Sequence, residues 1–331
     1  MTDGQSATVA PPVLPAEAAI SIIGGSGFIG RHLIRALVEV PSIRIIALTR
    51  DREAMTVAAS NLSWLQGDME DPVSLRGLLQ PGGTLVHLAY PTGWEPPRHL
   101  AAVTRLAEMA AEVGTKRIVL CSTAVVVGRA SAPSVDENIL AEPASDYERT
   151  KLEIEEAFIQ LRKDSCQLAI LRPTAVLGPG GKNLEKLSTD LLKGRRGTNY
   201  LRSSLYGARS MNLVGVGNVA AALQFLALRE QTDDHELYII SDDDDPLNNY
   251  RSIETELMRL LGVASYSLPP LPIPSWILAL VLRLSRRSNT NPHRIYSWAR
   301  LAQAGFRKPT TLRENLRQFV AARENPTPVE K

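Results

Sequence analysis

Short apolar runs alternate with amphipathic segments along the first half of the chain. Each apolar run has the length of a buried strand, and each amphipathic segment carries apolar residues at helical spacing. The expected strands are 19–23, 43–49, 62–66, 85–89, 116–123 and 169–174, and the expected helices are 30–40, 72–79, 100–113 and 147–162. Because strands that alternate with helices form right-handed βαβ units, the pattern predicts an α/β protein with a doubly wound parallel sheet. Ligands of such a sheet bind outside the carboxyl ends of its strands.

The second half of the chain is less regular and suggests a smaller, mostly helical portion. A polar helix and a basic loop are expected over 182–206, a strand at 211–216, a helix at 218–229, a late strand at 237–241, and helices at 253–261 and 311–322. The predicted parts are a disordered N-terminal extension (1–17), a sheet-bearing core (18–181), a substrate-binding portion (182–323, of which 211–241 returns to the core) and a flexible tail (324–331). The extension has neither the basic nor the apolar region of a signal peptide.

A glycine-rich turn joins the first expected strand to the first expected helix. Gly24 would make the tight turn, Gly27 would let the backbone approach a pyrophosphate, and Gly30 would let the helix pack closely on the strand. The amides at the start of the helix, at Phe28 and Ile29, would face the phosphate charge. A turn without a ligand is the alternative, but the strand and helix on either side favour a dinucleotide-binding site.

The end of the second expected strand bears on the choice of dinucleotide. In this kind of site an acidic residue bonds the ribose hydroxyls of NAD, whereas an arginine accommodates the extra phosphate of NADP. Thr49 stands at this position and Arg50 follows it, which favours NADP, while Asp51 keeps NAD open. A solvated charged loop is the alternative interpretation.

A second pattern suggests acid–base chemistry. Tyr147 and Lys151 are four residues apart in an expected helix and so share one face. An ammonium near a phenol lowers the pKa of the phenol, so Tyr147 could exchange a proton with a substrate alcohol or carbonyl, and Lys151 could also bind the nicotinamide ribose. Ser122 and Thr123 end the preceding strand, where a hydroxyl would polarise the substrate oxygen. The glycine turn, the strand-end hydroxyl and Tyr-x-x-x-Lys occur in this order.

With these motifs the chain resembles the extended short-chain dehydrogenase/reductase superfamily, of the NAD-dependent epimerase/dehydratase type, from Ile20 to about Val320. Further similarities lie at Gly67-Asp68, Val125 to Gly128, Leu171-Arg172-Pro173, Gly178-Pro179 and Leu213 to Ala220. The resemblance implies a Rossmann-like sheet and hydride transfer to or from a nicotinamide, with Thr123 and Tyr147 holding the substrate oxygen and Lys151 lowering the pKa of the tyrosine. It further implies cofactor contacts at Asp68, Met69, Ala89 and Pro173.

Some positions depart from the members of this family that act on nucleotide sugars. Ala175 and Leu177 stand where those proteins often carry Asn and Tyr, Val127 replaces the usual tyrosine before Gly128, and Asn218 stands where aspartate is common. The preferred function is therefore an NAD(P)-dependent oxidoreductase acting at a secondary alcohol or carbonyl of a small organic substrate. A nucleotide-sugar epimerase or dehydratase with retained NAD is the second candidate, and a non-catalytic NAD(P)-binding sensor or interaction protein is the third.

Composition narrows the partners. The chain has 37 Lys and Arg against 35 Asp and Glu, so no global field favours nucleic acid or an anionic membrane, and small-molecule partners are expected, with a homodimer left open. Cys121 and Cys166 stand in apolar runs without metal-ligand spacing, which predicts buried thiols, no metal site and a reducing, cytoplasmic environment.

Two further segments each have two structural interpretations. The four aspartates Asp242 to Asp245 are expected to form a solvated loop, with a metal site as the lesser interpretation. The apolar run Trp276 to Leu284 is too short to span a bilayer, and a buried helix covering a substrate pocket is favoured. The second interpretation is a helix lying on a membrane surface over 276–287, anchored by Trp276 and the basic Arg286-Arg287.

Overall fold

The computed structural model describes residues 18–130, 132–162, 165–229, 235–269, 271, 273–284 and 291–324. The predicted N-terminal extension and residues 325–331 of the predicted tail lie outside these ranges, and the statements below concern the residues within them.

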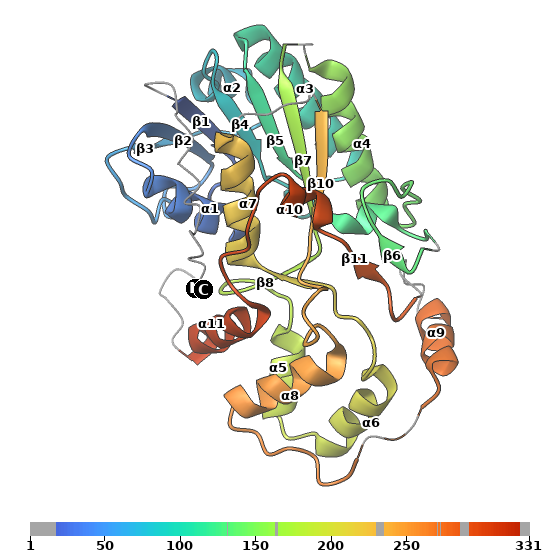
Figure 1. The fold of residues 1–331 in the computed structure, drawn as a ribbon. Helices are drawn as coiled ribbons and strands as arrows, with labels where there is room; N and C mark the ends of the chain where they lie inside the picture. Colours follow the sequence, from blue (N-terminus) through green and yellow to red (C-terminus); the bar gives the residue numbers. More distant parts are fainter. Residues whose placement is uncertain are drawn as a thin grey trace, which may run out of the picture.

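A parallel sheet forms the core of the larger part of the molecule (Figure 1). Seven strands make it up in the described chain, in the order β10-β7-β5-β4-β1-β2-β3. They are β1 (Ala18–Ile23), β2 (Ile43–Thr49), β3 (Leu62–Gln66), β4 (Thr84–His87), β5 (Arg117–Cys121), β7 (Gln167–Pro173) and β10 (His235–Ile240). The strand order reverses between β1 and β4, and this switch point is where doubly wound sheets bind their ligands. The predicted α/β fold class is confirmed.

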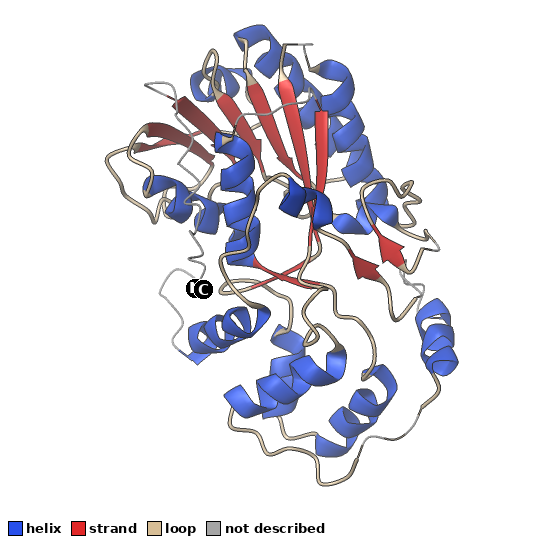
Figure 2. Cartoon of the chain, viewed as in Figure 1, coloured by secondary structure: helices blue, strands red, loops and turns tan. Residues whose placement is uncertain are grey.

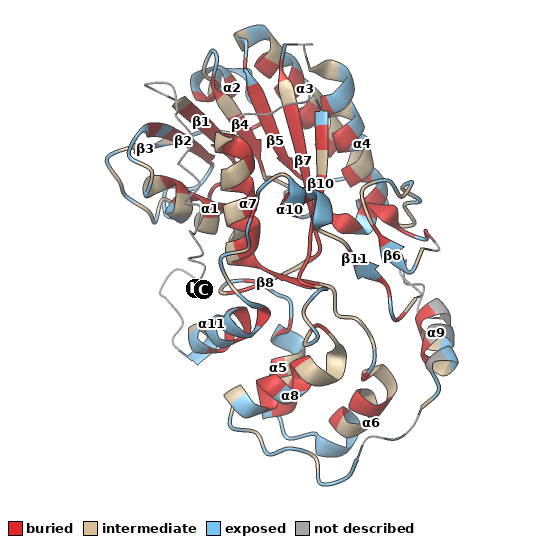
Figure 3. Cartoon of the chain, viewed as in Figure 1, coloured by how far each residue is buried: buried red, intermediate tan, exposed pale blue. Residues whose placement is uncertain are grey.

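Helices cover both faces of this sheet (Figures 1 and 2). On one face lie α1 (Phe28–Val38) and α7 (Val216–Leu228), and on the other lie α2 (Pro72–Leu78), α3 (Pro96–Val113) and α4 (Asp146–Leu161). Successive strand residues point to opposite faces, so Ile45 packs in the first core while Ile46 packs in the second. Figure 3 shows the inner strands buried along most of their length, as expected for a sheet covered twice, whereas the edge strand β3 is only partly buried.

The smaller part lies beyond the carboxyl ends of the strands and is mostly helical, as predicted (Figure 1). It contains α5 (Glu185–Leu192), α6 (Arg196–Tyr206), α8 (Tyr250–Leu260), α9 (Ser275–Leu284) and α11 (Leu312–Glu324). Short parallel pairs accompany them, β8 (Ala175–Leu177) with β9 (Leu213–Gly215) and β6 (Ser134–Val135) with β11 (Ile295–Tyr296). The short helices η1 (Ala124–Val127) and α10 (Ala299–Gln303) complete the described elements.

One helix replaces a predicted loop. A polar helix and a basic loop were expected over 182–206, but this stretch contains two helices, α5 and α6. The buried face of α6 consists of the polar residues Asn199, Ser203 and Ser204, and the Asn199 amide donates to the Asp190 carbonyl at 2.8 Å. Because that face is polar, no apolar periodicity marks the helix in the sequence.

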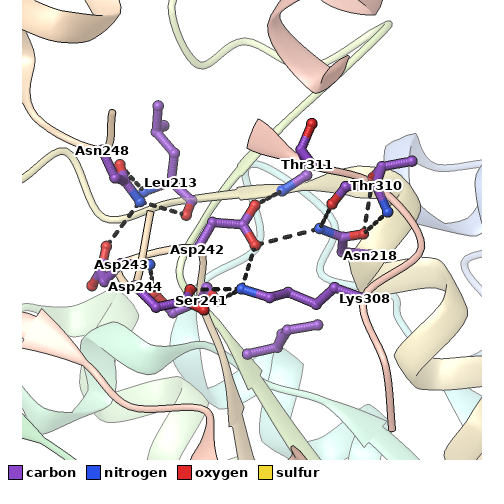
Figure 4. Close-up of polar contacts among 12 residues, drawn as sticks. Leu213, Asn218, Ser241, Asp242, Asp243, Asp244, Asn248, Lys308, Thr310 and Thr311 are labelled. Atoms are coloured by element: carbon purple, nitrogen blue, oxygen red, sulfur yellow. Dashed lines mark hydrogen bonds and ion pairs between the residues drawn. The ribbon is translucent and has the colours of Figure 1, made fainter. Parts of the chain in front are cut away.

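The predicted solvated loop of aspartates is wrong for its first two members. Asp242 is 2% exposed and its carboxylate lies 3.1 Å from the Lys308 ammonium (Figure 4). The other Asp242 oxygen accepts the Gly215 amide at 3.0 Å. Asp243 accepts the Tyr296 amide at 2.8 Å, and burial raises the pKa of Asp243 to about 6. No group of side chains in the described residues could hold a metal ion, so the lesser interpretation also finds no support there.

Asn218 belongs to the same network. Its amide nitrogen donates to Asp242 at 3.3 Å and to the Thr310 carbonyl at 2.9 Å, and its amide oxygen accepts from Thr310 (Figure 4). Asn218 therefore ties α7 to the end of β10 and to the segment before α11. An amide can donate and accept in this place, whereas a second carboxylate would face Asp242 with like charge.

The predicted buried helix at 276–284 is buried on one face only. In α9, Leu278 and Leu282 are buried, whereas Trp276 and Leu280 are exposed. Among the described residues, no helix is both long enough and apolar enough to cross a membrane.

We predict that Lys308→Met lowers the free energy of unfolding by about 3 to 5 kcal/mol, because it leaves the Asp242 carboxylate buried without its cation. Urea denaturation followed by circular dichroism measures the change. Lys186→Met is the matched control, since the Lys186 side chain is 82% exposed beside Asp190 and its pair should contribute at most about 1 kcal/mol. Equal and small losses in the two variants would contradict a structural role for the Asp242–Lys308 pair.

Candidate functional site

The glycine turn brings three backbone segments into contact at the switch point of the sheet. Gly24 has φ +87°, and a Cβ added there would lie 2.8 Å from the Ala89 amide nitrogen. A Cβ on Gly30 would lie 2.1 Å from the Gly24 carbonyl oxygen. Neither position has room for a side chain, so the turn, the start of α1 and the end of β4 can approach this closely only with glycine.

The N-terminus of α1 is open toward this turn. Gly27 is the N-cap and makes no side-chain cap, and the first turn of the helix contains no acidic residue. The first amides of a helix lack intrahelical acceptors, so those of Phe28 and Ile29 are suited to a phosphate. The side chains of these two residues have other surroundings, since Ile29 packs against the core and a Cβ on Gly181 would come within 2.6 Å of the Phe28 ring.

A cleft next to the turn collects residues from four strand ends. It is lined by Ile23, Gly24, Ser26, Leu48, Thr49, Arg50, Gly67, Asp68, Met69, Ala89, Pro91 and Trp94. Five residues predicted to bind the cofactor are therefore brought together here: Gly24, Arg50, Asp68, Met69 and Ala89. Asp51 is not among the lining residues, and its carboxylate accepts the Glu53 amide at 2.9 Å. The residue that favours NADP faces the cleft, whereas the residue that favours NAD folds back on its own loop.

The start of α4 is held in a defined position. The Ser145 hydroxyl accepts the Glu148 amide at 3.3 Å, and the Glu148 carboxylate accepts the Ser145 amide, which forms a capping box. Further along the helix, Glu155 and Arg172 of β7 form a buried two-point pair, with Arg172 Nε donating to Glu155 at 3.0 Å. These contacts hold the first two turns of α4, which carry Tyr147 and Lys151, against the carboxyl edge of the sheet.

Thr123, Tyr147 and Lys151 meet at the carboxyl end of β5. The Thr123 and Tyr147 side chains are hydrogen-bonded to each other. Lys151 is 6% exposed, and its ammonium donates to the Cys121 carbonyl at 3.4 Å. Cys121 is buried, as is Cys166, and burial raises the pKa of both thiols to about 11, so neither is a reactive thiolate.

The protonation of Tyr147 differs from the expectation that Lys151 lowers its pKa. Burial of the phenol raises the pKa of Tyr147 to about 12, although the hydrogen bond with Thr123 lowers it. The Tyr147 side chain is 42% exposed as a whole, so its ring reaches solvent while its hydroxyl is enclosed. Burial also lowers the pKa of Lys151. In this structure the desolvation of both groups outweighs the attraction expected from their spacing.

Tyr90 is a residue of the site that the sequence motifs did not single out. Its ring lies edge-on to the Tyr147 ring at 5.1 Å, and the Lys151 ammonium lies 4.7 Å from its centroid. Its chain neighbours Ala89 and Pro91 line the cleft described above. Tyr90 therefore links the cleft to the pair Tyr147 and Lys151. A cofactor contact was expected at Ala89, but no periodicity distinguishes the aromatic residue that follows it.

Two histidines complete these surroundings and were also missed. His99 of α3 stacks on Tyr90 with ring centroids 4.0 Å apart. His87 at the end of β4 is buried, and burial together with the Lys151 charge lowers its pKa to about 3. Burial lowers the pKa of His99 as well. Both rings are therefore held neutral beside the lysine, and the sequence gives no sign of this because buried histidines occur in many cores.

The polar groups at this edge fit a dinucleotide. The Ser122 hydroxyl is buried and has no hydrogen-bond partner within the described residues, and one hydrogen bond and one ring contact leave part of the Lys151 donor capacity for a ribose hydroxyl. Pro173 ends β7 at the same edge but does not line the cleft. The residues that would hold the cofactor are the glycine turn, the cleft and Lys151.

Comparison with known proteins agrees with this arrangement. Residues 20–240 match the model of the NAD dependent epimerase/dehydratase family. The chain is similar to sterol-4-alpha-carboxylate 3-dehydrogenase ERG26, decarboxylating, of Saccharomyces cerevisiae, with 25% identity over 184 residues, or 50% of this chain and 53% of the relative. The chain thus matches about half the length of this curated relative.

Solved structures share the fold. The UDP-glucuronic acid 4-epimerase of Bacillus cereus in complex with NAD has a TM-score of 0.72 at 16% identity, over 95% of this chain and 100% of that one. The Bordetella bronchiseptica enzyme WbmH in complex with NAD⁺ has a TM-score of 0.71 at 18% identity, over 94% and 100%. From the sheet order, the glycine turn and the family match, we conclude that this chain belongs to the NAD-dependent epimerase/dehydratase family, whose structures have the extended short-chain dehydrogenase/reductase fold.

Proposed function

We propose that this protein transfers hydride between a nicotinamide dinucleotide and a secondary alcohol or carbonyl carbon of a small organic substrate. The observation that carries the proposal is the hydrogen bond between Thr123 and Tyr147 at the sheet edge, with Lys151 and the cleft linked to it through Tyr90. In this view residues 18–181 hold the dinucleotide, and residues 182–323 form most of the substrate pocket.

At the carboxyl edge of the sheet, Thr123, Tyr147 and Lys151 then have distinct roles. Tyr147 Oη donates a proton to the substrate carbonyl oxygen during reduction and accepts it back during oxidation. Thr123 Oγ1 orients the phenol and binds the same substrate oxygen. The Lys151 ammonium holds the nicotinamide ribose and favours the phenolate by its charge. When bound, the nicotinamide supplies or accepts the hydride.

The protonation state of Tyr147 suits the reduction of a carbonyl. With a pKa of about 12, the Tyr147 phenol is protonated near neutral pH and is ready to donate. Oxidation of an alcohol requires the phenolate form of Tyr147. The Thr123 hydrogen bond favours the phenolate, and a closer approach of the Lys151 charge would favour it further. The neutral state of His87 and His99 leaves Lys151 as the cation nearest the phenol among these residues.

NADP is the preferred dinucleotide under this proposal. Arg50 lines the cleft at the end of β2, where the adenosine ribose would lie, and Thr49 beside it provides a hydroxyl instead of a carboxylate. A phosphate on that ribose would gain a charge-assisted hydrogen bond from the guanidinium.

A nucleotide-sugar epimerase or dehydratase with retained NAD is the second candidate. The fold similarity to a UDP-glucuronic acid 4-epimerase in complex with NAD favours it, whereas Ala175 and Leu177 argue against it. The yeast relative, by its name a dehydrogenase, favours net oxidation or reduction. Such an epimerase keeps its NAD and consumes none, while the proposed oxidoreductase exchanges NADP(H) with solution. The nucleotide released when the purified protein is denatured separates the two candidates.

For the acid–base role, we expect Tyr147→Phe to reduce turnover by roughly 10²- to 10⁴-fold, because the variant cannot transfer the proton. The dissociation constant for NADPH, measured by fluorescence titration, should stay nearly unchanged. Turnover is followed as NADPH oxidation with a panel of small ketones and as formation of epimerised or dehydrated product from nucleotide sugars. Tyr238→Phe, in the middle of β10, is the matched control. Undiminished turnover in Tyr147→Phe would exclude the assigned role.

For the hydrogen bond from Thr123, we expect Thr123→Val to raise the pKa of Tyr147 above that of the wild type. The bond favours the phenolate, so its loss favours the protonated phenol. The rate of alcohol oxidation, which needs the phenolate, should then rise at higher pH than in the wild type, and ultraviolet titration against Tyr147→Phe should follow the same shift. Thr123→Ser keeps the hydroxyl and should retain the wild-type profile. Identical profiles in all three proteins would contradict the proposal.

For cofactor choice, we expect Arg50→Ser to weaken NADPH binding by about tenfold or more and to change NADH binding little, because a charge-assisted hydrogen bond to the extra phosphate is lost. Arg52→Ser is the matched control, since Arg52 Nε donates to Gln66 at 2.6 Å and does not line the cleft. Equal weakening of NADPH and NADH binding in Arg50→Ser, or weaker NADPH binding only in Arg52→Ser, would argue for NAD.

A further inference from the structure

Exposed apolar side chains gather in one segment of the smaller part of the molecule. Of the twelve large apolar side chains that are exposed in the described residues, four lie between 268 and 280. They are Leu268 at 67%, Leu271 at 45%, Trp276 at 66% and Leu280 at 49%. The first two belong to the loop before α9, and the last two belong to α9. Four such side chains so close in sequence form an apolar surface, unlike single exposed residues elsewhere.

The helix α9 has two apolar sides that serve different purposes. Leu278 and Leu282 are four residues apart and buried, so they hold the helix on the protein. Trp276 and Leu280 are also four residues apart, and the helical period places them on the opposite side, where they are exposed. The intramolecular fold therefore explains one half of the apolar run and leaves the other half in contact with solvent.

The charge of the surrounding sequence is strongly one-sided. No Asp or Glu occurs between Glu256 and Glu314, whereas this stretch contains nine Lys and Arg residues. The rest of the chain has 28 basic residues against 35 acidic ones, so the balanced total conceals a basic segment. Lys308 and Arg300 pair with acidic groups, and Arg294 bonds backbone carbonyls. An arginine at 283 interrupts the apolar run, those at 286 and 287 follow it, and each is at least 27 positions from the nearest acidic residue in the sequence.

We infer that α9 and the preceding loop dock this protein on a membrane surface that contains anionic lipid. Apolar side chains on one side of a short helix insert at the boundary of headgroups and acyl chains, and tryptophan prefers that boundary because its ring is apolar and its indole N–H is polar. Arginines close to the helix in the sequence, at 283, 286 and 287, would be attracted by the negative surface potential. A second copy of the chain fits this surface less well, because a two-fold contact would bring the same basic segments together.

This inference is independent of the proposed hydride transfer. It concerns a surface on α9, and no residue of this surface lines the cleft or contacts Tyr147 in the described chain. It also replaces the interpretation of α9 as a fully buried cover of the substrate pocket, which the exposure of Trp276 contradicts.

The test is flotation of the full-length protein with two kinds of vesicle, pure phosphatidylcholine and an equal mixture of phosphatidylcholine and phosphatidylglycerol. We expect the protein to float with the mixed vesicles, to float less at high salt and to bind pure phosphatidylcholine weakly. The double variant Trp276→Ser with Leu280→Ser should lower partitioning into the mixed vesicles by about tenfold or more.

Two further variants separate docking from general effects. Val73→Ser with Leu140→Ser removes side chains that are 80% and 83% exposed on other elements, and should float like the wild type. Arg286→Glu with Arg287→Glu keeps the apolar side and should lose binding to the mixed vesicles through charge alone. Circular dichroism checks that each variant is folded.

Three results would overturn the inference. Failure of the wild type to float with either kind of vesicle would contradict the inference directly. If the variant Val73→Ser with Leu140→Ser lost as much flotation as the variant Trp276→Ser with Leu280→Ser, general surface hydrophobicity would be the cause of the flotation. A dimer in sedimentation that needs Trp276 and forms without vesicles would assign the surface to a second copy.

Discussion

The close backbone approach at Gly24 and Gly30 is the constraint on which the site depends. A side chain at Gly24 would collide with the Ala89 amide, and one at Gly30 would collide with the Gly24 carbonyl, so only glycine lets α1, β1 and the end of β4 come this close at the switch point. This close approach aims the open end of α1 at the cleft. Through Ala89 it also positions Tyr90, whose ring contacts Tyr147 and Lys151. The proposed phosphate site and the proposed proton-transfer site thus share one piece of backbone.

Burial sets the protonation states of the ionisable side chains at this edge of the sheet. Burial raises the pKa of Tyr147 and lowers the pKa values of Lys151, His87 and His99, so each group is moved toward its neutral form. Neutral groups close to one another cost less than a cluster of like charges in a dry site. The aromatic stack of Tyr90 and His99 contributes to this by enclosing the lysine. A substrate oxygen would then meet a phenol that already carries its proton.

Polar contacts help to tie the smaller part of the molecule to the sheet edge, together with an apolar cluster in which Ile239 of β10 packs with Val135 and Tyr296. Asp242, Lys308 and Asn218 join the end of β10, the segment before α11 and the start of α7. These contacts are directional, so they define how the helices of the smaller part stand over the strand ends. The apolar surface on α9 lies outside this network, which leaves it available for a partner.

The amino-acid sequence by itself determined the strands of the sheet, the glycine turn and the spacing of Tyr147 and Lys151, because apolar period and backbone geometry are local properties. It also placed Thr123 near the tyrosine through the order of strand and helix. Only the tertiary structure decided that α6 is a helix with a polar buried face, that Asp242 is buried against Lys308, and that Tyr90 and His99 enclose the lysine. The two faces of α9 were decided in the same way. Each of these depends on a partner that is distant in the chain, and burial by distant partners leaves no periodic signal in the sequence.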